Sequence, residues 1–297
     1  MTVFFQQLIN GLSLGFIYAL LALGYTMVYG ILRFINFAHS DVFMVGAFCG
    51  FYIGEKVPAH SIWGGVFVMV AAMLVCAALG IIIERLAYRP LRGGSNLAVL
   101  ITAIGVSLFL ENAGQLVFGA DPKPFPELFP YRNFTLPGGI YVSSYRLLVF
   151  VVTPALLIAL QWIVMRTRIG TAMRAVSFNH QAASLVGINN DRVISFTFGL
   201  GSALAAAGGI LYALNYPSID PYMGILPGLK AFVAAVLGGI GNIPGAALGG
   251  VLLGLIETFV NGSRYSTYTD AIAFGVLIVI LLFRPAGLLG KFQVEKV

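Results

Sequence analysis

Residues 62–83 read IWGGVFVMVAAMLVCAALGIII, a run without a single charged side chain. An α-helix needs about 20 predominantly apolar residues to cross the hydrocarbon core of a bilayer. This run is therefore predicted to be a transmembrane helix. Similar runs, bounded by charges or turn residues, cover residues 8–30, 97–118, 145–165, 193–215 and 271–289. Together they predict an all-α, polytopic transmembrane helix bundle.

The composition of the whole chain agrees with this fold class. Of 297 residues, 59% are hydrophobic and 9% are charged, and the mean hydropathy is +0.93. A soluble domain carries roughly a quarter charged residues, so most of this surface is predicted to face lipid. Residues 1–10 hold no Lys or Arg, unlike a secretory signal peptide. We expect a single transmembrane domain over residues 1–297, with the first apolar run retained as a helix.

A seventh hydrophobic segment, residues 34–54, is interrupted by polar side chains. It contains Asn36, His39 and Asp41. Ionisable residues inside apolar runs are costly and usually serve a transport path or a pair. Two interpretations stand side by side: these residues line a substrate path, or His39 and Asp41 form a local structural pair.

An eighth segment, residues 231–256, is interrupted by a glycine-rich stretch that includes Gly239, Gly241 and Asn242. Irregular backbone at membrane depth is stable only where protein or a water-filled cavity pairs its polar groups. Both interrupted segments are therefore predicted to be discontinuous helices beside a substrate path. A half-helix N-terminus at the glycine break would offer N–H donors to a substrate carboxylate. About eight hydrophobic elements are expected in all.

The distribution of basic residues predicts the orientation. The connections 83–97 and 165–193 are rich in Arg, whereas the loop 121–143 holds only Lys123 and Arg132 as basic residues. By the positive-inside rule, the first two connections face the cytoplasm and the third faces outward. The basic tail then lies inside if residues 225–256 enter the membrane and return. The net charge of +6 is explained by orientation and does not indicate a nucleic-acid partner.

Small residues four positions apart recur and predict close helix contacts. The pairs are Gly11 with Gly15, Gly201 with Ala205, Gly245 with Gly249, and Gly250 with Gly254. The hexapeptides 15–20 (GFIYAL) and 209–214 (GILYAL) differ at two positions, and each precedes an interrupted segment. This match suggests an internal repeat, although chance could also produce it in so apolar a chain.

The cytoplasmic connection 166–192 is predicted to contain a short amphipathic helix. The residues Ala182, Ala183 and Gly187 form an A-A-x-x-x-G pattern, in which small side chains suit a partner's groove and the glycine suits a turn. The pattern alone fits a docking helix and a simple covering helix equally well. It resembles the coupling-helix motif of ABC importer permeases, Glu-Ala-Ala-x-x-x-Gly. Gln181 stands where that motif has its acid, so the resemblance assigns ATPase coupling to Gln181, Ala182, Ala183 and Gly187.

Longer stretches resemble LivH-type permeases of branched-chain amino acid ABC importers, nearly from end to end. They are residues 25–30 (YTMVYG), 35–39 (INFAH), 84–90 (ERLAYRP), 182–188 (AASLVGI), 191–193 (DRV), 230–232 (KAF), 235–245 (AVLGGIGNIPG) and 294–297 (VEKV). The resemblance implies a multi-pass subunit of a bacterial inner membrane. It also implies a second permease of LivM type, two ATPase subunits and a periplasmic substrate-binding protein as partners.

Enzymatic functions find little support. The chain has no G-x-x-x-x-G-K-[ST] phosphate loop, so we expect ATP to be used by partner subunits. No cofactor is expected in this chain. Cys49 and Cys76 lie in apolar runs without metal-ligand spacing. Residues 11–15 match G-x-S-x-G but sit in a predicted helix, not on a strand-to-helix turn, so we expect no catalytic site.

The alternatives concern the substrate and the energy source. Permeases that resemble this chain handle branched-chain amino acids, other neutral amino acids, or urea and short amides. An ion-coupled secondary transporter would also have broken helices and buried acids. It would not need the helix within 166–192.

Overall fold

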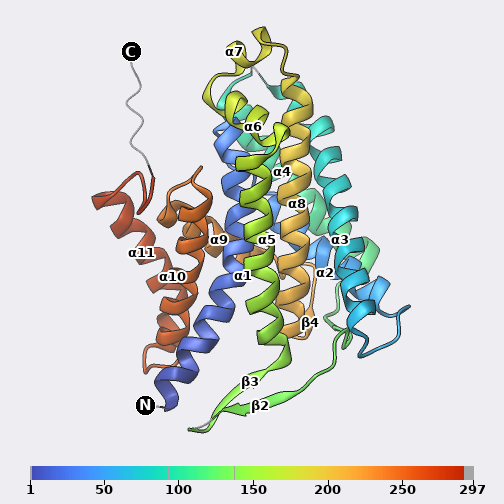
Figure 1. Cartoon of the computed structure of the whole chain (residues 1–297), viewed down its shortest axis with the longest axis vertical. Helices are drawn as coiled ribbons and strands as arrows, with labels where there is room; N and C mark the ends of the chain where they lie inside the picture. Colours follow the sequence, from blue (N-terminus) through green and yellow to red (C-terminus); the bar gives the residue numbers. More distant parts are fainter. Residues whose placement is uncertain (1, 93, 137, 291–297) are drawn as a thin grey trace.

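The computed structural model describes residues 2–92, 94–136 and 138–290 and shows an elongated helical bundle (Figure 1). In this part of the chain, seven helices are long and apolar enough to cross a membrane. The predicted polytopic helix bundle is thus confirmed. The family string at residues 294–297 lies outside the described residues.

The helices follow the chain in this order: α1 (Thr2–Leu32), α2 (His39–Gly54), α3 (Ile62–Ile83), α4 (Asn96–Phe118), α5 (Ser144–Arg166), α6 (Arg168–Phe178), α7 (His180–Leu185), α8 (Asn190–Asn215), α9 (Ile225–Gly238), α10 (Ile243–Asn261) and α11 (Thr269–Phe283). A π-helical turn, η1 (Glu84–Tyr88), and a 3-10 turn, η2 (Arg89–Leu91), follow α3, and a second 3-10 turn, η3 (Ser266–Tyr268), precedes α11. Ser61, Ser95 and Ser143 fix the starts of α3, α4 and α5, because each side chain accepts a backbone N–H of the first turn.

Four short strands lie outside the helices. The strands β2 (Asn133–Leu136) and β3 (Ile140–Ser143) form an antiparallel hairpin, and β1 (Lys123–Pro124) pairs antiparallel with β4 (Ser218–Ile219). The hairpin lies at the same end of the bundle as the N-terminus of α1, and α6 and α7 lie at the opposite end (Figure 1). We name these the outer end and the inner end, following the distribution of Arg.

Each uninterrupted run of the sequence corresponds to one helix, namely α1, α3, α4, α5, α8 and α11. The helix α11 ends at Phe283, short of the predicted residue 289. Two of these helices, α1 and α8, form the centre: 83% of the apolar window of each is buried, against 17% for α4 and 11% for α11. The peripheral helices therefore supply the surface that faces lipid.

Both interrupted segments are discontinuous, but in different ways. Residues 33–38 are not helical, so α2 begins only at His39. The segment 231–256 is not one broken helix: α9 ends at Gly238 and α10 begins at Ile243. The turn between them bends back because Gly239 and Gly241 adopt φ values of 103° and 91°, which favour glycine. The expected entry and return of this region therefore takes the form of two antiparallel helices. The hydrophobic helices of the described residues number nine rather than about eight, and α2 and α9 are shorter than a full crossing.

The first four helices and the last four repeat one arrangement in opposite directions. The helix α1 packs against α10 and α9, and α8 packs against α3 and α2 in the corresponding way. In each half, a long central helix is followed by a non-helical segment and a short helix, α2 or α9. Since α1 and α8 run in opposite directions (Figure 1), the halves are inverted. The hexapeptides 15–20 and 209–214 occupy α1 and α8, as a repeat requires.

Glycine permits a close helix contact between α1 and α10. A Cβ on Gly254 would collide with the backbone of Gly15, and a Cβ on Gly250 would collide with Ala19. Across the centre, Gly201 of α8 lies directly against Gly24 of α1. The predicted small-residue contacts are confirmed at these positions, where helix backbones approach without intervening side chains.

We predict that Gly254→Leu will destabilise the fold by about 3 kcal/mol, because the new side chain must force α1 away from α10. The matched control is Gly275→Leu in α11, where a Cβ would meet no atom within 4 Å. Thermal unfolding of both detergent-solubilised variants measures the difference. Equal melting temperatures would contradict the tight α1–α10 contact.

Candidate functional site

The short helices α2 and α9 meet inside the bundle with their N-termini together. Gly224 and Gly228 pack directly on Ser40, and a Cβ at either glycine would collide with it. Neither N-terminus carries a side-chain cap in the described structure. Uncapped helix N-termini present partial positive charge. We call the region where these two helix starts meet the α2–α9 junction.

The polar residues predicted for the first interrupted segment surround the α2 side of this junction. Asn36 accepts a hydrogen bond of 2.6 Å from the Tyr88 hydroxyl, and Asp41 accepts one of 2.5 Å from Ser107 of α4. His39 lies in a niche beside Gly24, with its ring 4.8 Å from that of Tyr25. His39 and Asp41 thus contact different helices and do not pair with each other.

All three side chains are buried, with exposed fractions of 5% for Asn36 and 1% each for His39 and Asp41. The His39 Nε2 atom makes no hydrogen bond to any described residue. Each side chain fixes the start of α2 to a different element: η1, α1 and α4 respectively. They are therefore placed at the junction but closed off from solvent in this conformation.

A second charged cluster, absent from the sequence-based prediction, holds α9. The Lys230 Nζ atom lies 2.6 Å from Glu257 of α10 and 2.7 Å from Asp270 of α11. The second Glu257 oxygen accepts a hydrogen bond of 2.8 Å from Tyr18 of α1. Four helices are joined by this cluster. The prediction missed this cluster because Lys230 and Glu257 lie just outside the ends of the run 231–256. The charge at each end of that run is the sequence signal that could have revealed it.

The two short helices thus carry opposite charges near their N-termini. Asp41 is the third residue of α2, and Lys230 is the sixth residue of α9. Buried charges are stable only when paired and hydrogen-bonded. Lys230 meets this requirement with two carboxylates, whereas Asp41 has only the hydroxyl of Ser107 as its partner.

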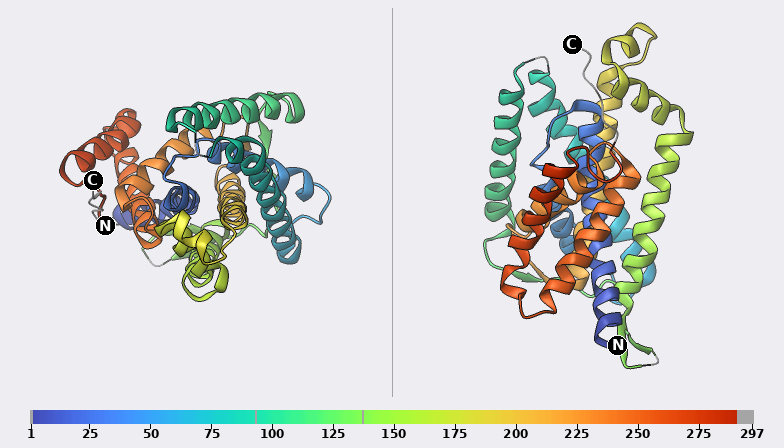
Figure 2. Two further views of the ribbon diagram at one scale, coloured as in Figure 1. Left: turned by 90° about the horizontal axis from the view of Figure 1, so that it is seen from above. Right: turned by 90° about the vertical axis from the view of Figure 1, so that its left-hand side faces the viewer.

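One face of α9 remains uncovered. Leu226 and Leu229 of α9 are 52% and 39% exposed, and Tyr222 in the preceding turn is 49% exposed. The flanking helices α4 and α11 pack on α2 and α9 respectively and lie apart on the same side of the bundle (Figure 2, left). The junction therefore lies beneath an open face between α4 and α11.

The glycine-rich turn predicted as part of the path lies elsewhere, at the inner end. Gly239 contacts Gly290, and a Cβ on Gly241 would lie 3.8 Å from Gly30 at the end of α1. The Asn242 side chain donates a 2.7 Å hydrogen bond to the Leu289 carbonyl and caps α10 by accepting the Gly245 N–H. The two groups of predicted path residues are therefore not brought together in one site.

The connection 166–192 forms two helices instead of one. The helix α6 packs on α1, α5 and α8, whereas α7 protrudes from the inner end (Figure 1). Asn179 separates them and caps α7. Within α7, Gln181 and Ala182 are exposed and Ala183 is buried, and Gly187 turns the chain away with φ of 85°.

Apolar side chains cover the tip of this protrusion. Phe178, Leu185 and Val186 are 88%, 87% and 75% exposed. Burial, together with the charges of Arg92 and Arg33, lowers the pKa of His180 in α7. Its imidazole is therefore neutral at pH 7. A neutral, apolar tip outside the membrane is suited to cover by another protein.

An ion network anchors the base of α7 to the rest of the bundle. The His180 carbonyl accepts a hydrogen bond from Asn190, at the start of α8, and the adjacent Asp191 pairs with Arg89 and Arg92. Arg92 also pairs with a buried carboxylate in η1, and Ser195 of α8 donates a 2.5 Å hydrogen bond to that same carboxylate.

That carboxylate belongs to Glu84, the first residue of the π-helical turn. Tyr88, four residues after Glu84 and the last residue of the same turn, donates the hydrogen bond to Asn36 described above. A chain of direct contacts therefore connects α7 to the segment preceding α2. Single π-helical turns often mark functional positions. This turn lies in the middle of the contact chain, because Glu84 connects it toward α7 and Tyr88 connects it toward the segment before α2.

The described residues contain no group of three or more His, Cys, Asp or Glu side chains placed to hold a metal ion. Cys49 and Cys76 are free thiols. The site is thus built from helix ends, paired charges and small residues.

Comparison with known proteins defines the class. Residues 7–282 match the family model described as branched-chain amino acid transport system / permease component. The chain belongs to this family of membrane permease components.

Individual relatives cover nearly the whole chain. The high-affinity branched-chain amino acid transport system permease protein BraD of Pseudomonas aeruginosa is 46% identical, over 99% of this chain and 98% of its own length. The corresponding protein LivH of Escherichia coli K12 is 42% identical, with the same coverage. A probable LivH of Methanocaldococcus jannaschii is 27% identical over 91% of this chain and 88% of the relative. The PsaBC structure from Streptococcus pneumoniae aligns with a TM-score of 0.47 at 12% identity, over 93% of this chain and 91% of that one.

The charged cluster around Lys230 generates a prediction. Lys230→Met leaves the Glu257 carboxylate buried without its cation, which we expect to cost about 3–5 kcal/mol. The double variant Lys230→Met, Glu257→Leu should recover most of this stability, because an apolar pair replaces an ion pair.

Thermal unfolding in detergent tests both variants. Lys56→Met is the control, since Lys56 is exposed at the outer end. An unchanged melting temperature for Lys230→Met would show that the cluster does not hold α9 in place.

Proposed function

We propose that this chain is the permease subunit of an ATP-driven importer of branched-chain amino acids in a bacterial inner membrane. The observation that carries the proposal is the exposed apolar tip of α7, tied by the Glu84 network to the start of α2. A secondary transporter has no need of such a tip. Near full-length similarity to BraD and LivH supports branched-chain amino acids as the substrate class.

We place the substrate path at the α2–α9 junction. An amino acid carries an ammonium and a carboxylate, which need an acceptor and donors respectively. Asp41 provides a buried acceptor, and the N-terminus of α9 with Lys230 provides donors. Broken helices whose N-termini meet near the midplane are a common form of transport site.

The remaining predicted residues receive supporting roles in this proposal. Asn36 and His39 hold the start of α2, so a movement at either changes the shape of the junction. Gly239, Gly241 and Asn242 lie at the inner end of the path, where the turn between α9 and α10 meets Gly30. We propose that this turn closes the path toward the cytoplasm.

The proposed partners follow from the uncovered surfaces. A second permease of LivM type would cover the face of α9 between α4 and α11. Two ATPase subunits would bind the complex from the inner end, one of them on α7 through Gln181, Ala182, Ala183 and Gly187. The chain has no phosphate loop of its own, so ATP would be hydrolysed on those subunits. A periplasmic binding protein would deliver substrate at the outer end.

Reconstitution tests the proposal. The chain is co-expressed with the second permease and ATPase subunits encoded beside it, and the complex is placed in liposomes with the neighbouring binding protein. We expect ATP-dependent uptake of leucine, isoleucine and valine. Uptake of urea or short amides in their place would overturn the substrate, and uptake by this chain alone on a cation gradient would overturn the mechanism.

The docking role of α7 has a separate prediction. Leu185→Asp places a charge on the exposed apolar tip, and we expect the ATPase subunits to be lost from the purified complex at least tenfold more readily. The control is Phe134→Asp on the outer hairpin, where the side chain is 45% exposed and far from α7 (Figure 1). Quantifying the co-purified ATPase decides the matter; equal retention in both variants would remove α7 from the docking surface.

A further inference from the structure

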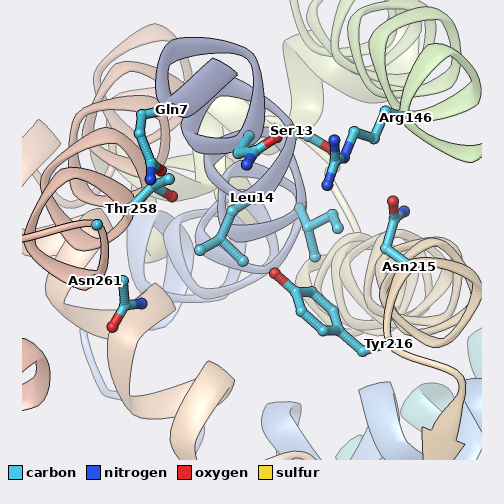
Figure 3. Close-up of a pocket in the computed structure, with 11 residues that line it drawn as sticks. Gln7, Ser13, Leu14, Arg146, Asn215, Tyr216, Thr258 and Asn261 are labelled. Atoms are coloured by element: carbon cyan, nitrogen blue, oxygen red, sulfur yellow. The ribbon is translucent and has the colours of Figure 1, made fainter. Parts of the chain in front are cut away.

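A polar cavity opens at the outer end of the bundle, among α1, α5, α8 and α10 (Figure 3). Its volume is about 250 Å³. Gln7, Asn10 and Ser13 line its α1 side at spacings of three residues, and Thr258 and Asn261 line its α10 side in the same way. Residues three apart lie on one helix face. Each helix thus turns a polar stripe toward the cavity.

The cavity extends inward along α1 from Gln7 to Ile17, a helical rise of about 15 Å. Polar side chains at such depth in a membrane helix are costly and usually mark a functional path. The inner part changes character, because the residues that line it, Leu14 and Ile17, are apolar; they are 8% and 1% exposed. The cavity therefore combines a polar mouth with an apolar inner wall.

One cation lines the cavity, Arg146 at the start of α5. Its guanidinium makes a single hydrogen bond, a long one of 3.5 Å to the Tyr141 carbonyl. No carboxylate among the described residues lies within ion-pair distance of it, and none lines the cavity. The Arg146 side chain extends toward the cavity opposite Asn215 (Figure 3). The guanidinium thus leaves most of its five donors available to an anion.

This set of groups matches one kind of ligand. A guanidinium suits a carboxylate, to which it can donate two parallel hydrogen bonds. The side-chain oxygens of Asn215 and Ser13 are acceptors for an ammonium group. Leu14 and Ile17 suit an aliphatic side chain.

We propose that this cavity is a binding site for a neutral, aliphatic α-amino acid, with its carboxylate on Arg146 and its side chain on Leu14 and Ile17. The inference rests on the proposed function and adds to it a site within this one subunit. Tyr18 follows Ile17 in α1, and Glu257 precedes Thr258 in α10. The Tyr18 hydroxyl donates a hydrogen bond to Glu257, and Glu257 also accepts one from Lys230 of α9. A ligand in the cavity therefore lies next to the cluster that holds the α2–α9 junction.

Thiol labelling tests the site without relying on transport. Asn10→Cys is introduced into the full importer complex with Cys49→Ala, while Cys76 stays because it is buried. A membrane-impermeant thiol reagent should label Asn10→Cys, and leucine should slow the labelling. Leucinamide, which lacks the carboxylate, should not. Val151→Cys, on an exposed face of α5, is the reporter control and should not react, because a thiol in lipid does not ionise.

Arg146→Gln should raise the leucine concentration needed for half-protection about tenfold or more, the loss expected for a charged hydrogen bond of about 1.5–3 kcal/mol. Arg146→Lys should recover part of it. The control is Arg132→Gln, a change of the same charge at an exposed position outside the cavity.

Four outcomes would overturn the inference. They are an unreactive Asn10→Cys, labelling that leucine does not slow, equal protection by leucinamide, and protection that requires the binding protein rather than free leucine. Uptake by the unmodified complex separates this result from the proposed function. Normal leucine uptake without protection removes only the cavity site, whereas absent uptake with protection removes the transport proposal and leaves the site.

Discussion

The fold depends on one constraint: two helices begin in the interior of a membrane bundle, where no water can pair their backbone groups. The segments 33–38 and 216–224 lead into these starts and are largely non-helical. Non-helical backbone at such depth must be enclosed by protein. The central helices α1 and α8 provide that enclosure, and their 83% burial follows from it. Glycine and alanine recur along them because backbones that surround so small a space must approach closely.

The inverted arrangement extends this constraint to charge. Each half delivers one short helix, and near the N-terminus of each lies a buried side chain of opposite charge type, the acid Asp41 in α2 and the base Lys230 in α9. The two environments differ, because Asp41 receives a single hydroxyl whereas Lys230 receives two carboxylates. With Lys230 at +1 and Glu257 and Asp270 at −1 each, that cluster carries −1 overall when all three are ionised. Asp270, half-exposed on α11, is the member that solvent or a partner can reach.

The two ends of the molecule reach the junction by different routes. From the inner end, the route is a series of paired charges and hydrogen bonds, from α7 through Asp191 and Glu84 to Tyr88 and Asn36. From the outer end, it is a cavity whose wall residues adjoin the Tyr18–Glu257 pair. Both routes end on a short helix, α2 in the first case and α9 in the second. Because these helices contact each other at Ser40, the two routes meet at the α2–α9 junction.

Composition and hydropathy alone determined that the chain is a polytopic helix bundle, since an apolar run such as 62–83 is stable in lipid as a transmembrane helix. The sequence also located both interrupted segments, because glycine and polar residues in an apolar run are rarely tolerated without a reason. It did not determine that α9 and α10 are separate helices, since a turn and a kink use the same residues. Nor did it reveal the cluster of Lys230, Glu257 and Asp270 or the cavity at Arg146. Their members lie far apart in the chain, at the edges of apolar runs, and only the packing of α1, α5, α8, α9, α10 and α11 brings them together.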